Sequence, residues 1–153
     1  MKKMIRIFSL VIATVILLSI PVYADESNTY SSLFFASYDS FIHVPSGRNL
    51  EIWFDVVGNG SMDEIGVSYI DLERSSDGIN WTVVRTFLPE DYPQMIYEDS
   101  GFNCDYISYM GAYGYYFRAY VTYYAKNSRG CGNEYEYTPA VYLTPPTGIL
   151  PRS

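Results

Sequence analysis

The sequence predicts an all-β protein: a single antiparallel sandwich of two sheets and about seven strands, preceded by a signal peptide. Apolar and polar residues alternate in short segments, and Gly, Asn, Asp, Ser and Pro separate those segments. No helical period runs through the chain after its leader. Tyr and Phe are abundant, and aromatic side chains suit the pleated surface of a sheet.

Residues 1–24 have the three parts of a cleavable signal peptide. Three basic side chains lie within the first six residues, residues 7–20 are almost entirely apolar, and Val22 and Ala24 occupy the positions that signal peptidase recognises. An uncleaved membrane helix is the alternative, but it needs about 20 apolar residues and a basic inner flank. Because the run is shorter and acidic Asp25 follows it, we expect cleavage after Ala24.

Cleavage would leave a strongly acidic protein. It removes three of the ten basic residues and none of the seventeen acidic ones, so the net charge becomes −10. Such a chain is repelled by nucleic acids and by anionic lipid surfaces. Asp25, rather than a lipid-bearing cysteine, follows the cleavage point. We therefore expect a secreted, extracellular protein with no nucleic-acid partner and no stable membrane anchor.

The expected strands follow from alternation and turn residues. An N-terminal segment, residues 25–48, holds the first strand, and residues 49–144 form the sandwich core before a proline-containing tail, residues 145–153. Residues 58–61 predict a turn between the second and third strands, and residues 75–78 predict a tight hairpin. The seven expected strands are residues 34–44, 49–57, 67–74, 81–87, 104–110, 115–125 and 134–143, the last kinked at Pro139.

Two of these segments carry a family resemblance. Residues 74–84 resemble the central hairpin of bacterial fibronectin type III domains, and residues 115–121 resemble the penultimate strand of that family. The early core strand also matches, except that Phe54 stands where the family usually has Trp, and residues 111–114 replace its Leu-x-Pro turn. The resemblance covers roughly residues 49–143 and implies an immunoglobulin-like sandwich. The chain also resembles a small family of secreted Gram-positive proteins, which implies no activity.

The two cysteines, Cys104 and Cys131, predict a disulfide. An even number of cysteines without metal-ligand spacing favours a bridge in an oxidising compartment, and two free thiols are the alternative. The fibronectin-like strand order implies that Cys104 and the loop of residues 126–133 meet at one end of the sandwich.

Catalytic and metal-binding motifs are absent from the sequence. His43 is the only histidine, so any Ser-His-Asp or Cys-His arrangement would depend on it alone. The acidic pairs at residues 63–64 and 98–99, with Asp105, lack the spacing of a calcium loop, and a solvated acidic loop is the simpler interpretation. We therefore predict no catalytic residue, no metal and no cofactor.

Alternation on the strand from Tyr115 predicts an exposed aromatic face. If Phe117 points into the core, then Tyr116, Arg118 and Tyr120 point outward, and Tyr69 on the neighbouring strand joins them. Exposed Tyr and Arg favour protein or glycan binding. Cross-strand packing without a ligand is the alternative.

These observations favour a secreted, non-catalytic binding or interaction module whose ligand is an extracellular protein or a glycan. Two alternatives stay open: a small secreted enzyme that acts on polysaccharide, and a structural matrix or coat protein. A cleft with two carboxylates would favour the enzyme, whereas a long unpaired edge strand would favour assembly. The sequence does not specify the oligomeric state.

Overall fold

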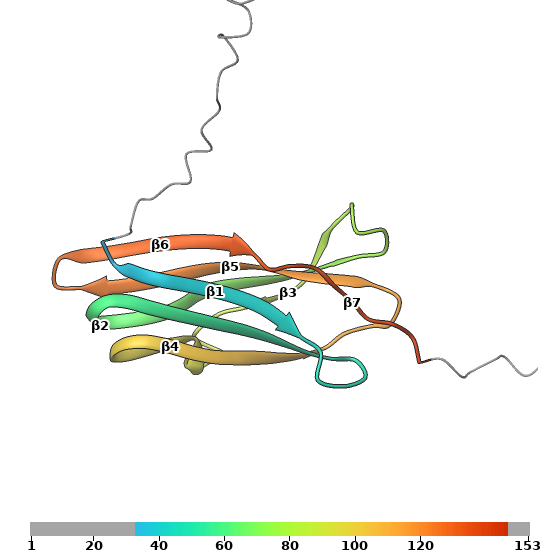
Figure 1. Cartoon of the computed structure of the whole chain (residues 1–153), viewed down its shortest axis with the longest axis horizontal. Coiled ribbons are helices and arrows are strands. Elements are labelled where there is room, and N and C mark those ends of the chain that lie inside the picture. The colour runs from blue at the N-terminus through green and yellow to red at the C-terminus, as the bar shows by residue number, and fades with distance from the viewer. Residues whose placement is uncertain (1–32, 147–153) are drawn as a thin grey trace, which may run out of the picture. The chain divides into compact units, whose positions relative to one another are not determined.

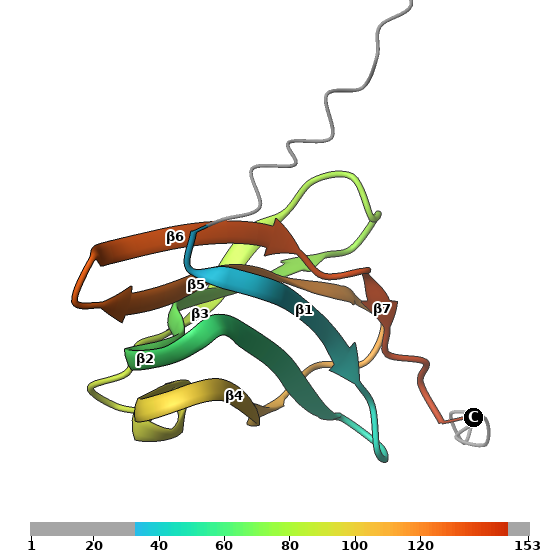
Figure 2. The same ribbon diagram turned by 60° about the vertical axis from the view of Figure 1, so that its left-hand side comes forward.

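The computed structural model describes residues 33–146 and is all-β (Figures 1 and 2). Its seven strands form one antiparallel sheet that curls into a half-barrel. The predicted signal peptide, residues 1–24, and most of the predicted tail lie outside the described residues. Among residues 33–146 there is no helix long and apolar enough to cross a membrane.

The bounds of β1, β3 and β5 agree with the sequence prediction to within two residues, whereas those of the other strands differ from it. A single 3-10 turn, η1 (Pro93–Met95), precedes the fourth strand. The strands are β1 (Phe35–His43), β2 (Asn49–Ser75), β3 (Thr82–Phe87), β4 (Ile96–Met110), β5 (Tyr116–Asn127), β6 (Gly130–Tyr137) and β7 (Val141–Tyr142). The predicted kink at Pro139 corresponds to the break between β6 and β7.

Strand β2 corrects the prediction of a turn at residues 58–61. The chain continues through this segment as one strand of 27 residues. Gly60 adopts φ +100°, which other residues rarely adopt, so the strand can bend here without reversing. At Gly66, with φ +149°, an added Cβ would lie 2.0 Å from the Met95 carbonyl oxygen. The two glycines thus allow β2 to bend and the chain at Met95 to approach it closely. Glycines also occur in turns, so the residue types alone do not distinguish a bend within a strand from a turn.

The bent β2 organises the whole sheet. Its first half pairs with β1 on one side and β4 on the other, and its second half pairs with β3 and β5. Strands β6 and β7 then pair with β5. Figure 2 shows the resulting curl, with β1 lying beside β5 and β6 across the opening.

The core lies inside the curl and follows the predicted alternation. Phe117, Ala119 and Val121 of β5 are buried, as expected, because successive side chains of a strand point to opposite faces. Burying one large apolar side chain contributes about 1.5–3 kcal/mol, so the core is the main source of stability. Its other fully buried large members are Phe54, Phe87, Leu50, Ile52, Met62, Ile65, Ile70, Leu72, Met95, Ile107 and Tyr123.

A polar cluster joins β1 to β5 and β6 at the opening. The Tyr123 hydroxyl and the Ser40 Oγ both donate to Oε1 of Glu136, the latter over 2.9 Å. The Tyr38 ring lies 4.7 Å from that of Tyr123. Burial, with help from the Glu136 carboxylate, raises the pKa of Tyr123 well above its usual value, so the hydroxyl stays a donor. These contacts bind the two edges of the half-barrel together.

The two cysteines lie on different strands of the sheet. Cys104 and Cys131 are both exposed free thiols, and the predicted disulfide is not formed. Cys131 lies on β6 opposite Lys126 rather than in a loop, and Cys104 lies on β4 opposite Asp55. Strands β4 and β6 are not neighbours, and both thiols point away from the core.

Candidate functional site

The structure brings the four predicted face residues together. Tyr116, Arg118 and Tyr120 lie on the outward side of β5, and Tyr69 lies on the outward side of β2. All four side chains are half-buried rather than fully exposed. Four further aromatic side chains extend the same surface. We call the whole set the tyrosine face: Tyr69, Trp81, Tyr116, Arg118, Tyr120, Tyr135, Tyr137 and Tyr142.

Sequence reasoning missed the most exposed members of this face. Tyr135, Tyr137 and Tyr142 are 67%, 51% and 45% exposed. They lie on β6 and β7, where the register places Tyr137 opposite Tyr120 and Tyr142 opposite Tyr116. Alternation within β6 could have assigned Tyr135 and Tyr137 to one face. Alternation does not specify that β6 pairs with β5. Only this pairing shows that Tyr135 and Tyr137 lie on the same side of the sheet as Tyr120.

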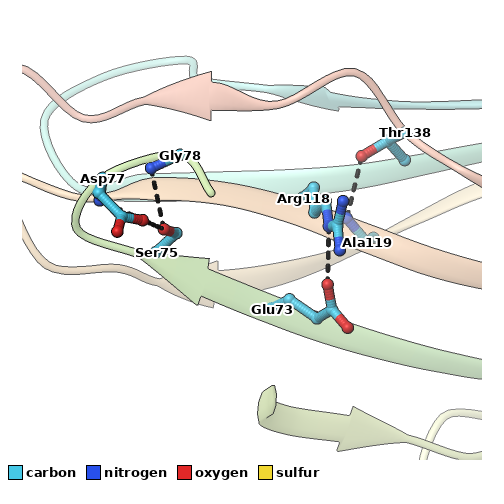
Figure 3. A network of polar contacts seen from close by, with 7 residues as sticks. All are labelled: Glu73, Ser75, Asp77, Gly78, Arg118, Ala119 and Thr138. Atoms are coloured by element: carbon cyan, nitrogen blue, oxygen red, sulfur yellow. Dashed lines mark hydrogen bonds and ion pairs between the residues drawn. The ribbon is translucent and has the colours of Figure 1, made fainter. Parts of the chain in front are cut away.

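Arg118 is the centre of the tyrosine face. Its Nε donates to Oε2 of Glu73 over 2.7 Å (Figure 3). Its Cζ lies 4.2 Å from the ring centroid of Trp81 and 4.2 Å from that of Tyr137, so the guanidinium contacts both rings. A cation between two aromatic rings is attracted by both of them. Arg118 therefore fixes the positions of Trp81 and Tyr137, and its charge is already paired within the protein.

The remaining rings pack in pairs around this centre. The Tyr120 ring centroid lies 5.0 Å from that of Tyr137 and 5.8 Å from that of Tyr135. The centroids of Tyr116 and Tyr142 are 4.7 Å apart. Cross-strand aromatic pairs stabilise a sheet and also limit ring motion. The face is thus an ordered aromatic surface whose outer rings on β6 and β7 stay accessible.

Tyr69 has a mainly structural environment. Its hydroxyl donates to Oδ2 of Asp71 over 2.7 Å, and Thr86 on β3 donates to Oδ1 of the same carboxylate over 2.5 Å. The hydrogen bond to Asp71 raises the pKa of Tyr69. Asp71 therefore links β2 to β3, and the Tyr69 hydroxyl is engaged with the same carboxylate.

The hairpin before β3 positions Trp81. Asp77 accepts hydrogen bonds from the backbone N–H groups of Ile79 and Asn80 and from the side chain of Asn80. These donors, together with Ser75, hold the pKa of Asp77 well below its usual value. Gly78, at φ +73°, donates its N–H to the Ser75 Oγ over 2.9 Å (Figure 3). The turn predicted from this Ser-Asp-Gly run is therefore present and rigid.

The other candidate residues lie apart from the tyrosine face. His43 is exposed on β1, with its Nδ1 3.2 Å from Oε2 of Glu51. Within residues 33–146, no three His, Cys, Asp or Glu side chains form a group that could hold a metal ion. The acidic pairs at residues 63–64 and 98–99 lie within β2 and β4 rather than in loops, and Lys126 donates to Oε1 of Glu64 over 2.5 Å.

Comparisons of the chain with protein-family models, with curated proteins and with solved structures found no match.

Proposed function

We propose that this protein is a secreted, non-catalytic binding module that recognises an extracellular protein or glycan through its tyrosine face. The observation that carries the proposal is the accessibility of Tyr135, Tyr137 and Tyr142 around the paired Arg118. Tyr and Trp rings provide large contact areas at low entropic cost, particularly where they are already ordered.

We further propose that the half-barrel is a fibronectin type III-like sandwich. The pairing divides naturally into two groups that share β2. Its first half lies between β1 and β4, and its second half continues through β3, β5 and β6. This grouping is the support for two layers. Loops and sheet faces of such sandwiches commonly carry binding sites, although the fold alone identifies no ligand.

The open edge of β4 favours a discrete binding module over an assembling coat protein. The Tyr106 N–H donates to its neighbour Asp105 Oδ1 over 2.7 Å, and the Phe102 N–H donates to Ser100 Oγ over 3.2 Å. These side chains occupy backbone donors that an added strand would need. Self-blocked edges of this kind oppose strand-to-strand assembly.

A comparison of two ring deletions tests the proposed function. Immobilised residues 25–153 would first be used to capture ligand from the producing culture, with a glycan array run in parallel. Tyr135→Ala should then weaken capture by about 1–3 kcal/mol while barely altering the unfolding temperature, because the ring is accessible. Phe102→Ala is the matched control, since Phe102 is 58% exposed but lies outside the tyrosine face.

The packing alternative predicts the opposite pattern. If Tyr135→Ala lowers the unfolding temperature and leaves capture intact, the tyrosine face stabilises the sheet and binds nothing. Equal loss of capture in Phe102→Ala would also contradict the assignment of the binding surface.

A further inference from the structure

A second set of aromatic side chains lies on the outward surface of β1, the first half of β2 and β4. The register places Phe41, Trp53 and Tyr106 in one row across these strands. The ring centroids of Phe41 and Trp53 are 6.3 Å apart with planes 4° from parallel, and those of Trp53 and Tyr106 are 4.6 Å apart with planes 26° from parallel. Phe41 is 48% exposed and Tyr106 is 38% exposed.

The rows on both sides of these rings are acidic. Asp39 lies directly opposite Asp55 in the register, and both side chains are exposed. Like charges directly opposite each other destabilise a sheet, and within residues 33–146 the structure gives neither carboxylate an ion pair. On the other side, Glu51 accepts from the Trp53 indole over 3.1 Å and lies beside His43.

The strand segments of this half of the sheet also lack permanent positive charge, and Arg48, directly before β2, contacts Met110 at the end of β4. The segments that form it, residues 35–43, 49–57 and 102–110, contain no Lys and no Arg. Hydrogen bonds from His43 and Trp53 lower the pKa of Glu51, so this carboxylate stays ionised. We call the surface formed by Phe41, Trp53, Tyr106, Asp39, Glu51 and Asp55 the acidic ring face.

We propose that the acidic ring face binds a basic polypeptide segment, in a function separate from that of the tyrosine face. Lys or Arg side chains of the partner would contact the exposed rings of Phe41 and Tyr106 and pair with Asp39 and Asp55. A cation beside both an aromatic ring and a carboxylate gains from both interactions. The partner supplies the positive charge that this half of the sheet lacks.

The spacing of the rows fits an extended segment. Neighbouring side chains on one face of a strand are about 6.6 Å apart along the chain, so the aspartate row and the ring row match alternate residues of an extended peptide. A neutral glycan fits less well. Sugar rings stack on open aromatic faces, and Trp53 is flanked by Phe41 on one side and Tyr106 on the other.

Fluorescence anisotropy with a short labelled peptide in which Arg and Ser alternate would test this inference. Residues 25–153 should bind the peptide, and the affinity should fall as salt rises from about 50 to about 300 mM. The double variant Asp39→Asn and Asp55→Asn should bind about tenfold more weakly, because two carboxylates are lost. Its unfolding temperature should be unchanged or higher, which shows that the variant is folded.

Two controls separate a specific site from general negative charge. Glu90→Gln with Asp91→Asn removes the same charge from an exposed connection after β3, and its affinity should stay within about twofold of the parent. Peptides with Gln or Glu in place of Arg should not bind. The proposal would be overturned if the control pair weakened binding as much as the Asp39 and Asp55 variant, or if the Asp39 and Asp55 variant bound the peptide unchanged. It would also be overturned if the Gln peptide or a neutral glucan bound as well as the Arg peptide.

Discussion

The tyrosine face and the acidic ring face both carry clustered aromatic side chains, but their charges are arranged in opposite ways. On the tyrosine face, Arg118 is paired with Glu73 and held between two rings. On the acidic ring face, Asp39 and Asp55 lie side by side, and neither forms an ion pair with another residue of the described range 33–146. Exposed aromatic content alone therefore does not indicate what a surface binds. The two faces differ in whether the charged side chains among the rings are paired within the protein.

The largest expected effect is the loss of Arg118. Arg118→Ala removes the partner of a mostly buried Glu73 carboxylate and the cation between Trp81 and Tyr137, so it should lower the free energy of unfolding by about 2–3 kcal/mol. Urea denaturation would measure it. Arg85→Ala is the matched control, because that side chain is exposed and makes only long contacts. Equal losses in the two variants would show that Arg118 is not the centre of the face.

A smaller effect concerns the turn that positions Trp81. The pKa of Asp77 is depressed in the folded protein, so its contribution to stability is present above its unfolded pKa and is lost as the pH falls through the folded value. The stability difference between the parent and Asp77→Asn should therefore shrink below about pH 4. Asp91→Asn should show no such trend. A difference that stays constant from neutral to acid pH would contradict the role given to the Asp77 carboxylate.

The sequence predicted which side chains of a strand face the core better than it predicted which strands pair with each other. Alternation correctly assigned Phe117, Ala119 and Val121 to the core, because a period of two is a local property of the backbone. The Gly, Asn and Ser residues around Gly60 were interpreted as a turn, because the same residue types occur in a turn and at a bend within a strand. Pairing between distant segments is set by the tertiary fold.

The same limit applies to the two aromatic faces. The four predicted residues of the tyrosine face come from strands with clear alternation, and they lie together. Phe41, Trp53 and Tyr106 are separated by long stretches of sequence, and only the register of β1, β2 and β4 places them in one row. The placement of Cys131 shows the same limit, because this residue lies in a strand that begins before the expected boundary rather than in a loop.

The contrast between the two faces is tested most directly by one chemical change made on each of them. Glu73→Gln and Asp55→Asn both convert a carboxylate to an amide of similar shape, and urea denaturation at neutral pH compares them. Glu73→Gln should lower the free energy of unfolding by about 1–2 kcal/mol, because it breaks a partly buried pair with Arg118. Asp55→Asn should leave it unchanged or raise it by about 0.5 kcal/mol, because it removes repulsion from Asp39. Losses of the same size in both variants would contradict the account.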